Sequence, residues 1–237
     1  MEHMLSVRGL KVSRGGKQVL HGIDLDVRAG EITALLGANG AGKSSTVLAT
    51  GGVIPFTAGS ITLDGATLVK ATPDAVRRAG IAIVPEGHHV LGGLSVLDNL
   101  RAAATLLPKS EVAPAIDRIL TVFPELEPKL RLLGGSLSGG QKQMVCVAQA
   151  LLARPKVLVV DELSLGLAPL VIKRLADVVQ ATTREGTAVL LIEQFTTLAL
   201  SLASYAFVLE RGRVAWSGSA AELRARPEVL HSSYLGT

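Results

Sequence analysis

A glycine-rich stretch from Gly37 to Ser44 constrains the fold of this chain more than any other feature of its sequence. It fits the pattern G-x-x-x-x-G-K-[ST], with Gly37, Gly42, Lys43 and Ser44 at the fixed positions. Glycines let backbone N–H groups turn inward as a nest for anions, which side chains would obstruct. In this pattern the lysine reaches the β- and γ-phosphates, and the hydroxyl binds the accompanying Mg²⁺. The stretch therefore predicts a strand, a phosphate-binding loop and a helix that points its positive end at a triphosphate.

The residues on both sides of the loop suit this arrangement. Glu31–Leu36 has the composition of a buried strand, and a helix is expected from Lys43 to about Thr50. A flexible glycine turn between a strand and a helix is the alternative interpretation. The agreement of both flanks with the strand–loop–helix pattern favours phosphate binding.

The composition favours one large domain, or a compact domain with an inserted lobe. The chain has 237 residues, of which 48% are hydrophobic, enough for a substantial core. It has no uninterrupted apolar run of about 18 residues, which a membrane span would need. The N-terminal residues lack the basic region and long apolar core of a signal peptide. A single cysteine, Cys146, in an apolar run, indicates a buried structural thiol and a reducing compartment, so we expect a cytoplasmic location.

The charge distribution gives little support to nucleic-acid binding. The formal net charge is +4, but the basic residues are scattered, with Arg77–Arg78 and the Arg211/Arg213 pair the densest spots. Aromatic residues, which could stack on bases, make up only 3% of the chain. We therefore expect an ordinary solvated surface and no nucleic-acid partner.

Strand and helix patterns alternate along the chain, except in one central region. From about residue 96 to residue 153, apolar residues recur at helical spacing between prolines, which indicates three or four helices. A further helix is expected over residues 170–184. Strands are expected over residues 5–12, 19–27, 59–63, 81–84, 157–160 and 188–192, and on both sides of the turn at residues 211–212. Strands and helices that alternate around a phosphate loop predict an α/β fold with a mostly parallel sheet.

Two carboxylates follow an apolar strand in the second half of the chain. Asp161, at the end of Val157–Val160, is placed to hold Mg²⁺ through its water shell, and Glu162 is placed to polarise an attacking water. An ordinary helix N-cap region is the alternative. The phosphate loop upstream favours the catalytic interpretation.

A second anion site is indicated by the sequence Leu-Ser-Gly-Gly-Gln at residues 137–141. Ser138 and the glycine N–H groups stand at the start of a helix, where anions bind readily. One chain has no evident need for two triphosphate sites. We therefore infer a head-to-tail dimer, in which the second site of each chain caps the nucleotide held by the other.

Together these motifs resemble those of ABC-type ATPases. The L-S-G-G-Q sequence ends 20 residues before the Asp-Glu pair (161 minus 141), and the resemblance extends over essentially the whole chain. The chain is most similar to the ATP-binding subunits of branched-chain amino acid importers. The segments that carry this finer resemblance are Val84–Gly87, Leu94–Leu100, Ser164–Pro169 and Tyr234–Gly236.

The resemblance implies a P-loop NTPase core with a mostly parallel sheet, an antiparallel β subdomain and an inserted helical subdomain. The core and its β subdomain would occupy residues 1–90 and 154–237, and the helical subdomain about 91–153. It further implies an ATP- and Mg²⁺-dependent ATPase that drives import of branched-chain or related small amino acids or amides. Two membrane permease subunits, fed by a solute-binding protein, would be its partners at the cytoplasmic face of the membrane. The dimer would pair it with a different ATPase subunit, and a pair of identical copies is the alternative.

The resemblance also assigns site residues. Lys43, Glu162 and Gln194 would be catalytic, and Ser44, Asp161 and Glu86 would hold the metal. The residues that would contact the nucleotide are Arg14, Gly37, Ala38, Asn39, Gly40, Ala41, Gly42, Lys43, Ser44, Ser45, Glu86, Ser138, Gly139, Gly140 and Gln141. Glu193, beside Gln194, is interpreted as the end of a strand rather than as a catalytic group.

Five positions depart from the residues usual in the family. Glu86 replaces Gln and adds negative charge near the metal, while Gln194 replaces His and can donate a hydrogen bond but cannot carry a proton. Arg14 replaces an aromatic residue that stacks on adenine, which a planar guanidinium can also do. Ala168 replaces Asp, as the branched-chain subgroup tends to do. Leu163 replaces Pro, and apolar packing is the role we expect for it.

Other functions stay open at this point. Soluble ABC proteins of DNA repair or translation usually carry a long coiled coil or two fused cassettes, and this chain has neither. An exporter is disfavoured because no membrane segment is fused. A regulatory partner with weakened hydrolysis is motivated by Gln194 and Glu86, whereas the intact Glu162, Lys43 and Ser138 argue against it.

Overall fold

The computed structural model describes residues 3–68 and 71–230. The segment Tyr234–Gly236, which contributes to the family resemblance, lies outside the described residues. The strands are β1 (His3–Arg14), β2 (Lys17–Arg28), β3 (Ile32–Leu36), β4 (Ala58–Leu63), β5 (Ala66–Thr67), β6 (Ile81–Val84), β7 (Val157–Asp161), β8 (Ala188–Glu193), β9 (Tyr205–Glu210) and β10 (Arg213–Ser219). The α-helices are α1 (Lys43–Thr50), α2 (Pro73–Ala79), α3 (Val96–Ala103), α4 (Lys109–Val122), α5 (Gly139–Leu151), α6 (Pro169–Arg184), α7 (Thr196–Leu202) and α8 (Ala220–Arg224).

A six-stranded sheet forms the centre of the molecule. Its strand order is β10-β9-β3-β8-β7-β6, in which β10 pairs antiparallel with β9 and every other pair is parallel. Strands β3, β7 and β8 are buried along their whole length. Parallel strands covered on both faces need continuous apolar runs, which is the pattern these segments show. The structure therefore confirms the predicted α/β fold with a mostly parallel sheet.

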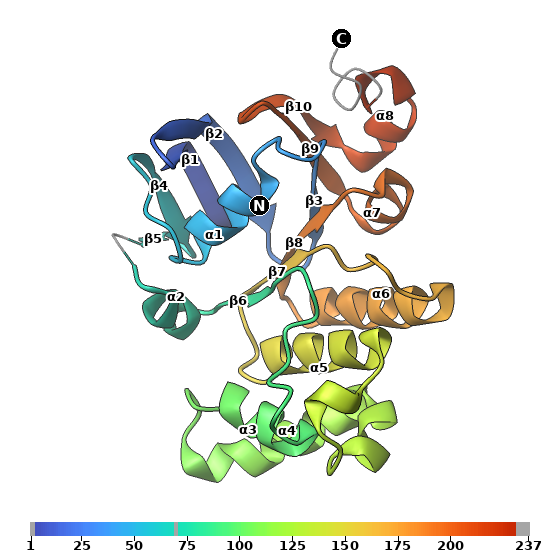
Figure 1. The fold of residues 1–237 in the computed structure, drawn as a ribbon. Coiled ribbons are helices and arrows are strands. Elements are labelled where there is room, and N and C mark those ends of the chain that lie inside the picture. The colour runs from blue at the N-terminus through green and yellow to red at the C-terminus, as the bar shows by residue number, and fades with distance from the viewer. Residues whose placement is uncertain (1–2, 69–70, 231–237) are drawn as a thin grey trace.

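The two faces of the central sheet pack against different partners. Leu158 and Val160 of β7 belong to one core with α5 and α6, whereas Val157 and Val159 belong to a second core, because successive strand residues point to opposite faces. The second core includes α1 and a four-stranded antiparallel sheet of order β2-β1-β4-β5. Figure 1 shows this antiparallel sheet and α1 on one side of the central sheet, and α5 and α6 on the other.

The chain between β6 and β7 is largely helical, as the apolar spacing predicts. It holds α3, α4, α5 and two short 3₁₀ helices, Pro124–Lys129 and Gly134–Ser136. Figure 1 shows it at the end of the molecule opposite the antiparallel sheet. Cys146 is buried in this region, and burial raises the pKa of its thiol to about 11. The boundary of a separate helical subdomain at about 91–153 stays a prediction.

Candidate nucleotide site

The strand order brings four loops of the chain to one edge of the sheet. In the register of the parallel strands, Leu36 pairs with Glu193, Ile192 with Asp161, and Val160 with Val84. The phosphate loop, Gln194 and Glu162 follow directly beyond these strand ends, and Glu86 lies two residues beyond the end of β6. In open parallel sheets, ligands bind in the crevice at the carboxyl ends of the strands. A cavity of about 450 Å³ lies there, lined by Asn39, Gly40, Gly42, Lys43, Ser44, Ser45, Glu86, Glu162, Leu165 and Gln194.

The phosphate loop depends on glycine at positions 37, 40 and 42. Gly40 and Gly42 have φ of 80° and 111°, in the left-handed region that disfavours other residues. A Cβ on Gly37 would lie 2.3 Å from the Leu209 carbonyl oxygen, and one on Gly42 would lie 2.6 Å from the Leu20 side chain. Gly42 is the N-cap of α1 and offers no side-chain cap. The first N–H groups of α1 are therefore oriented as a nest for an anion.

Lys43 is the first residue of α1 and is only 6% exposed. Its Nζ donates hydrogen bonds to the carbonyl oxygens of Gly37 at 2.7 Å and Ala38 at 3.2 Å. Burial lowers the pKa of Lys43, and the neighbouring carboxylates of Glu162, Asp161 and other acidic residues oppose this shift. These bonds hold the ammonium group against the backbone of the glycine-rich loop.

Four carboxylates, those of Glu162, Asp161, Glu86 and Glu193, act on the charge of this lysine. Burial, followed by the charges of Glu162 and Glu86, raises the pKa of Asp161 to about 6. Burial and then Glu86 also raise the pKa of Glu162. Among the described residues, no group of three or more His, Cys, Asp or Glu could hold a metal ion by itself. This donor set fits Mg²⁺, which at nucleotide sites is bound by one or two protein groups together with phosphates. Ser44 is in the cavity lining, and Asp161 is buried at the end of β7.

Glu162 has an unusual backbone conformation. Its φ is 57°, in the left-handed region, and its N–H donates to the Ile192 carbonyl oxygen at 2.9 Å. A non-glycine residue in this region is uncommon, and such conformations concentrate at functional sites. The bond to β8 holds the strained residue so that Glu162 lines the cavity.

The family resemblance gives no role to Glu193, but the structure shows that it positions a loop. Glu193 is 1% exposed, and its carboxylate accepts hydrogen bonds from the N–H and the Oγ–H of Ser164, both at 3.0 Å. Burial raises the pKa of Glu193, and the bonds from Ser164 oppose that shift. Glu193 thereby ties the loop after Glu162 to the strand that leads into Gln194. Leu163, in the same loop, is fully buried in the larger core, which confirms the expected apolar packing.

A second unexpected link joins the loop after Glu86 to α5. His88, with φ of 53°, places its Nδ1 2.7 Å from Gln143 Oε1, and the tautomer protonated at Nδ1 donates a hydrogen bond to that oxygen. Both links join residues far apart in the sequence.

The remaining predicted site residues lie elsewhere in this chain. Arg14 is exposed at the end of β1, where it pairs in register with Lys17. Ser138, Gly139, Gly140 and Gln141 form the start of α5. Neither Arg14 nor this group belongs to the described lining of the cavity. Gly37, Ala38 and Ala41 are also outside that lining. The carbonyl oxygens of Gly37 and Ala38 accept from Lys43, and the Ala41 N–H donates to the Ala38 carbonyl within the loop.

Gln141, which is predicted to contact the nucleotide, also caps the start of α5. Ser138 Oγ accepts the Gln141 N–H at 3.3 Å, and Gln141 Oε1 accepts the Ser138 N–H at 3.1 Å. This reciprocal pair is a capping box, and the spacing S-x-x-Q in the sequence is its signature.

Comparison with known proteins identifies the family. A model of the ABC transporter family matches residues 20–164. The chain belongs to this family. It is 38% identical to the high-affinity branched-chain amino acid transport ATP-binding protein BraG of Pseudomonas aeruginosa, over 98% of this chain and 100% of that protein. It is 34% identical to the probable branched-chain amino acid transport ATP-binding protein LivF of Archaeoglobus fulgidus, over 92% and 93% of the two chains.

The fold comparison agrees with this assignment. A solved structure described as an ATP binding subunit of an ABC transporter superposes with a TM-score of 0.84 at 30% identity, over 97% of this chain and 95% of that one. The chain is thus an ABC ATPase that resembles the branched-chain amino acid subgroup. ATP-binding subunits of this family dimerise and work with permease subunits. Within the part of the chain that the structure describes, no helix has the length and apolar character to cross a membrane.

Proposed function

We propose that this chain binds ATP with Mg²⁺ and hydrolyses it to drive import of branched-chain amino acids, or of related small amino acids or amides. The observation that carries the proposal is the convergence of Lys43, Glu86, Glu162 and Gln194 on one cavity from four separate loops. The similarity to BraG, which is named for branched-chain amino acid transport, supports the substrate class.

Each residue around the cavity has a role that its position suits. The nest and Lys43 would hold the β- and γ-phosphates, and Ser44 and Asp161, with Glu86 nearby, would hold Mg²⁺. The bound cation would neutralise charge that develops on the phosphates. Glu162 would accept a proton from the water that attacks the γ-phosphorus, a task for which its raised pKa suits it. Gln194 would donate a hydrogen bond to the γ-phosphate.

We also propose that the start of α5 completes the site of a second ATPase subunit. The first helical bond there is donated by the Lys142 N–H to the Ser138 carbonyl, so the N–H groups of Gly139 and Gly140 precede it. These donors are at an exposed helix start, outside the lining of the chain's own cavity. A head-to-tail pair would bring them to the partner's nucleotide. We favour a partner of different sequence, with a pair of identical copies as the alternative.

The permease contact is proposed at a patch of exposed leucines beside the Glu86 loop. Leu91 is 53% and Leu133 is 54% exposed, and Leu94 and Leu132 are also exposed. Backbone bonds from Gly134 to Leu94 and from Gly135 to Gly92 hold the two segments together. Contiguous apolar surface commonly marks a protein contact. This surface would lie at the cytoplasmic face of the membrane, and a solute-binding protein would act through the permeases.

The substitution Glu162→Gln tests the proposal. It should preserve ATP binding, lower turnover by a factor of about 100 or more because the general base is lost, and accumulate an ATP-bound dimer. Steady-state phosphate release and size-exclusion chromatography with light scattering measure these effects, with Glu185→Gln at an exposed helix end as the control. Normal turnover in Glu162→Gln would remove Glu162 from the catalytic role. Absence of turnover in the unsubstituted chain with its permeases would favour the regulatory alternative.

A further inference from the structure

A second cavity lies between the C-terminal end of α1, strand β4 and helix α2, and we propose that it binds a neutral small molecule with an apolar body and one hydrogen-bonding group. The cavity has a volume of about 630 Å³, within the range of roughly 300–1,000 Å³ typical of ligand pockets. None of its described lining residues has a charged side chain. Its apolar side chains include those of Val53, Ile54, Phe56, Ile61, Leu68 and Val76. This lining disfavours a charged ligand, including a zwitterionic amino acid.

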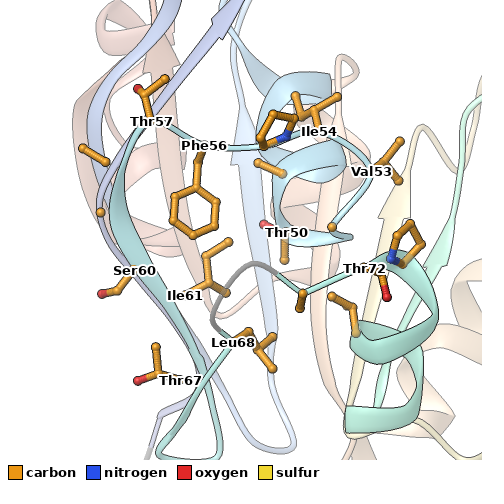
Figure 2. A pocket seen from close by; sticks show the side chains of 18 residues that line it. Thr50, Val53, Ile54, Phe56, Thr57, Ser60, Ile61, Thr67, Leu68 and Thr72 are labelled. Carbon is orange, nitrogen blue, oxygen red and sulfur yellow. The ribbon is translucent and has the colours of Figure 1, made fainter.

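Thr50 supplies the polar feature of the cavity. It is 1% exposed, and its Oγ1 has no hydrogen-bond partner among the residues that the structure describes. Figure 2 shows this oxygen on the side of α1 that faces Phe56 and Ile61, across the cavity. A buried hydroxyl without a partner is costly, whereas a ligand that hydrogen-bonds to it recovers that cost. The ligand therefore needs a donor or acceptor at this point.

Two other hydroxyls of the lining have partners within the protein. Thr57 Oγ1 donates to the Lys11 carbonyl at 3.2 Å, and Thr72 Oγ1 accepts the Ala75 N–H at 3.3 Å as the N-cap of α2. Thr50 thus differs from these threonines. It also differs from the lining residues Ser60, which is half-buried, and Thr67, which is exposed, because water can reach their hydroxyls. The buried hydroxyl of Thr50 is therefore the one to which we assign the single polar group of the ligand.

The turn after α1 and the segment that leads into α2 are in close backbone contact at one side of the cavity. Gly52 has φ of 69°, and a Cβ on it would lie 2.4 Å from the Ala71 carbonyl oxygen and 3.1 Å from the Val76 side chain. The turn after α1 can therefore lie against the start of α2 only with glycine at this position. This contact makes the cavity a feature of the folded backbone rather than a gap between loosely placed side chains.

Cyclohexanol is a suitable probe, because it has an apolar ring and one hydroxyl. Titration into the full chain, followed by methyl NMR, should shift the signals of Ile54, Ile61 and Val76 in a saturable way. Thr50→Val should weaken binding about fivefold, the value of one hydrogen bond, whereas Thr50→Ser should retain it. Thr182→Val, which removes a hydroxyl outside the cavity, should leave affinity unchanged. Val76→Phe should abolish binding by filling the space.

Three results would overturn the proposal. One is equal affinity for cyclohexanol in Thr50→Val and the unsubstituted chain. Another is saturable binding of cyclohexylammonium at neutral pH with the same affinity, because the lining should exclude a charge. The third is a set of methyl shifts that appears with added permease subunits and not with cyclohexanol, which would make the cavity a protein contact instead.

Discussion

Helices α1 and α5 both begin with glycine-rich motifs, yet they satisfy their first N–H groups in opposite ways. Every α-helix starts with N–H groups that have no partner within the helix. At α1 the N-cap is Gly42, in the left-handed region and without a side chain to accept them. At α5 the N-cap is Ser138, which forms a complete capping box with Gln141. The first N–H groups of α1 are therefore free of a side-chain cap and suited to bind an anion. At α5, the capping box already stabilises the helix start without a ligand.

The two helix starts also differ in burial and in the charges around them. Lys43, the first residue of α1, is buried, and Asp161, Glu162 and Glu86 act on its charge. The start of α5 is exposed. A buried, charged site must be assembled by the chain's own fold, because misplaced charges there are costly. An exposed site that is already capped can be presented to a second subunit, which is the role proposed for α5.

The largest expected effect comes from removal of the charge at α1. Lys43→Ala should weaken ATP binding on the order of 100-fold, since hydrogen bonds to charged groups contribute about 1.5–3 kcal/mol. Titration calorimetry with ATP and Mg²⁺ measures this loss. Lys142→Ala, which removes a lysine from the first turns of α5, is the matched control and should bind ATP with unchanged affinity. If Lys43→Ala bound ATP normally, the phosphate-loop assignment would be wrong.

A smaller effect is expected at the start of α5. Ser138→Ala should lower the free energy of unfolding by about 1 kcal/mol, because the cap is lost. It should also reduce ATP turnover, which needs the capped motif across the dimer. Chemical denaturation and phosphate release measure the two quantities.

The helix α8 offers a matched control for that experiment. Ser219 and Glu222 form the same capping box there, with both bonds at 3.1 Å. Ser219→Ala should cost similar stability and leave turnover unchanged. Equal loss of turnover in both variants would reduce Ser138 to a structural cap and break the distinction between the two helix starts.

Both helix starts could be predicted from the sequence, because each is encoded by consecutive residues. Gly37–Ser44 prescribes its own loop, and Ser138 and Gln141 stand at the spacing of a capping box, although the family resemblance assigns Gln141 to the nucleotide alone. The parallel direction of the central strands also follows from the alternating strand and helix patterns. These features share a local cause, the conformational preferences and hydrogen bonds of neighbouring residues.

Contacts between distant segments could not be predicted in this way. The bonds from Ser164 to Glu193 exist because β7 and β8 are neighbours in the sheet, and the strand pattern alone does not say which parallel strands are adjacent. The contact of His88 with Gln143 likewise needs the helical segment folded back on the Glu86 loop. That the Thr50 hydroxyl has no partner among the described residues depends on what surrounds it in three dimensions.

The smallest expected effect concerns α6, which begins with neither a glycine N-cap nor a capping box. Its N-cap, Ala168, has no side-chain hydrogen bond, and Pro169 follows at the first helical position. Ala168→Asp should raise the free energy of unfolding by about 1 kcal/mol, because the carboxylate can accept N–H groups of the first turn. Ala168→Asn, which caps without charge, separates the hydrogen bond from the helix dipole. Denaturation of both variants measures the gain. No gain in either variant would show that α6 has its first N–H groups satisfied without a cap, a third way of starting a helix in this fold.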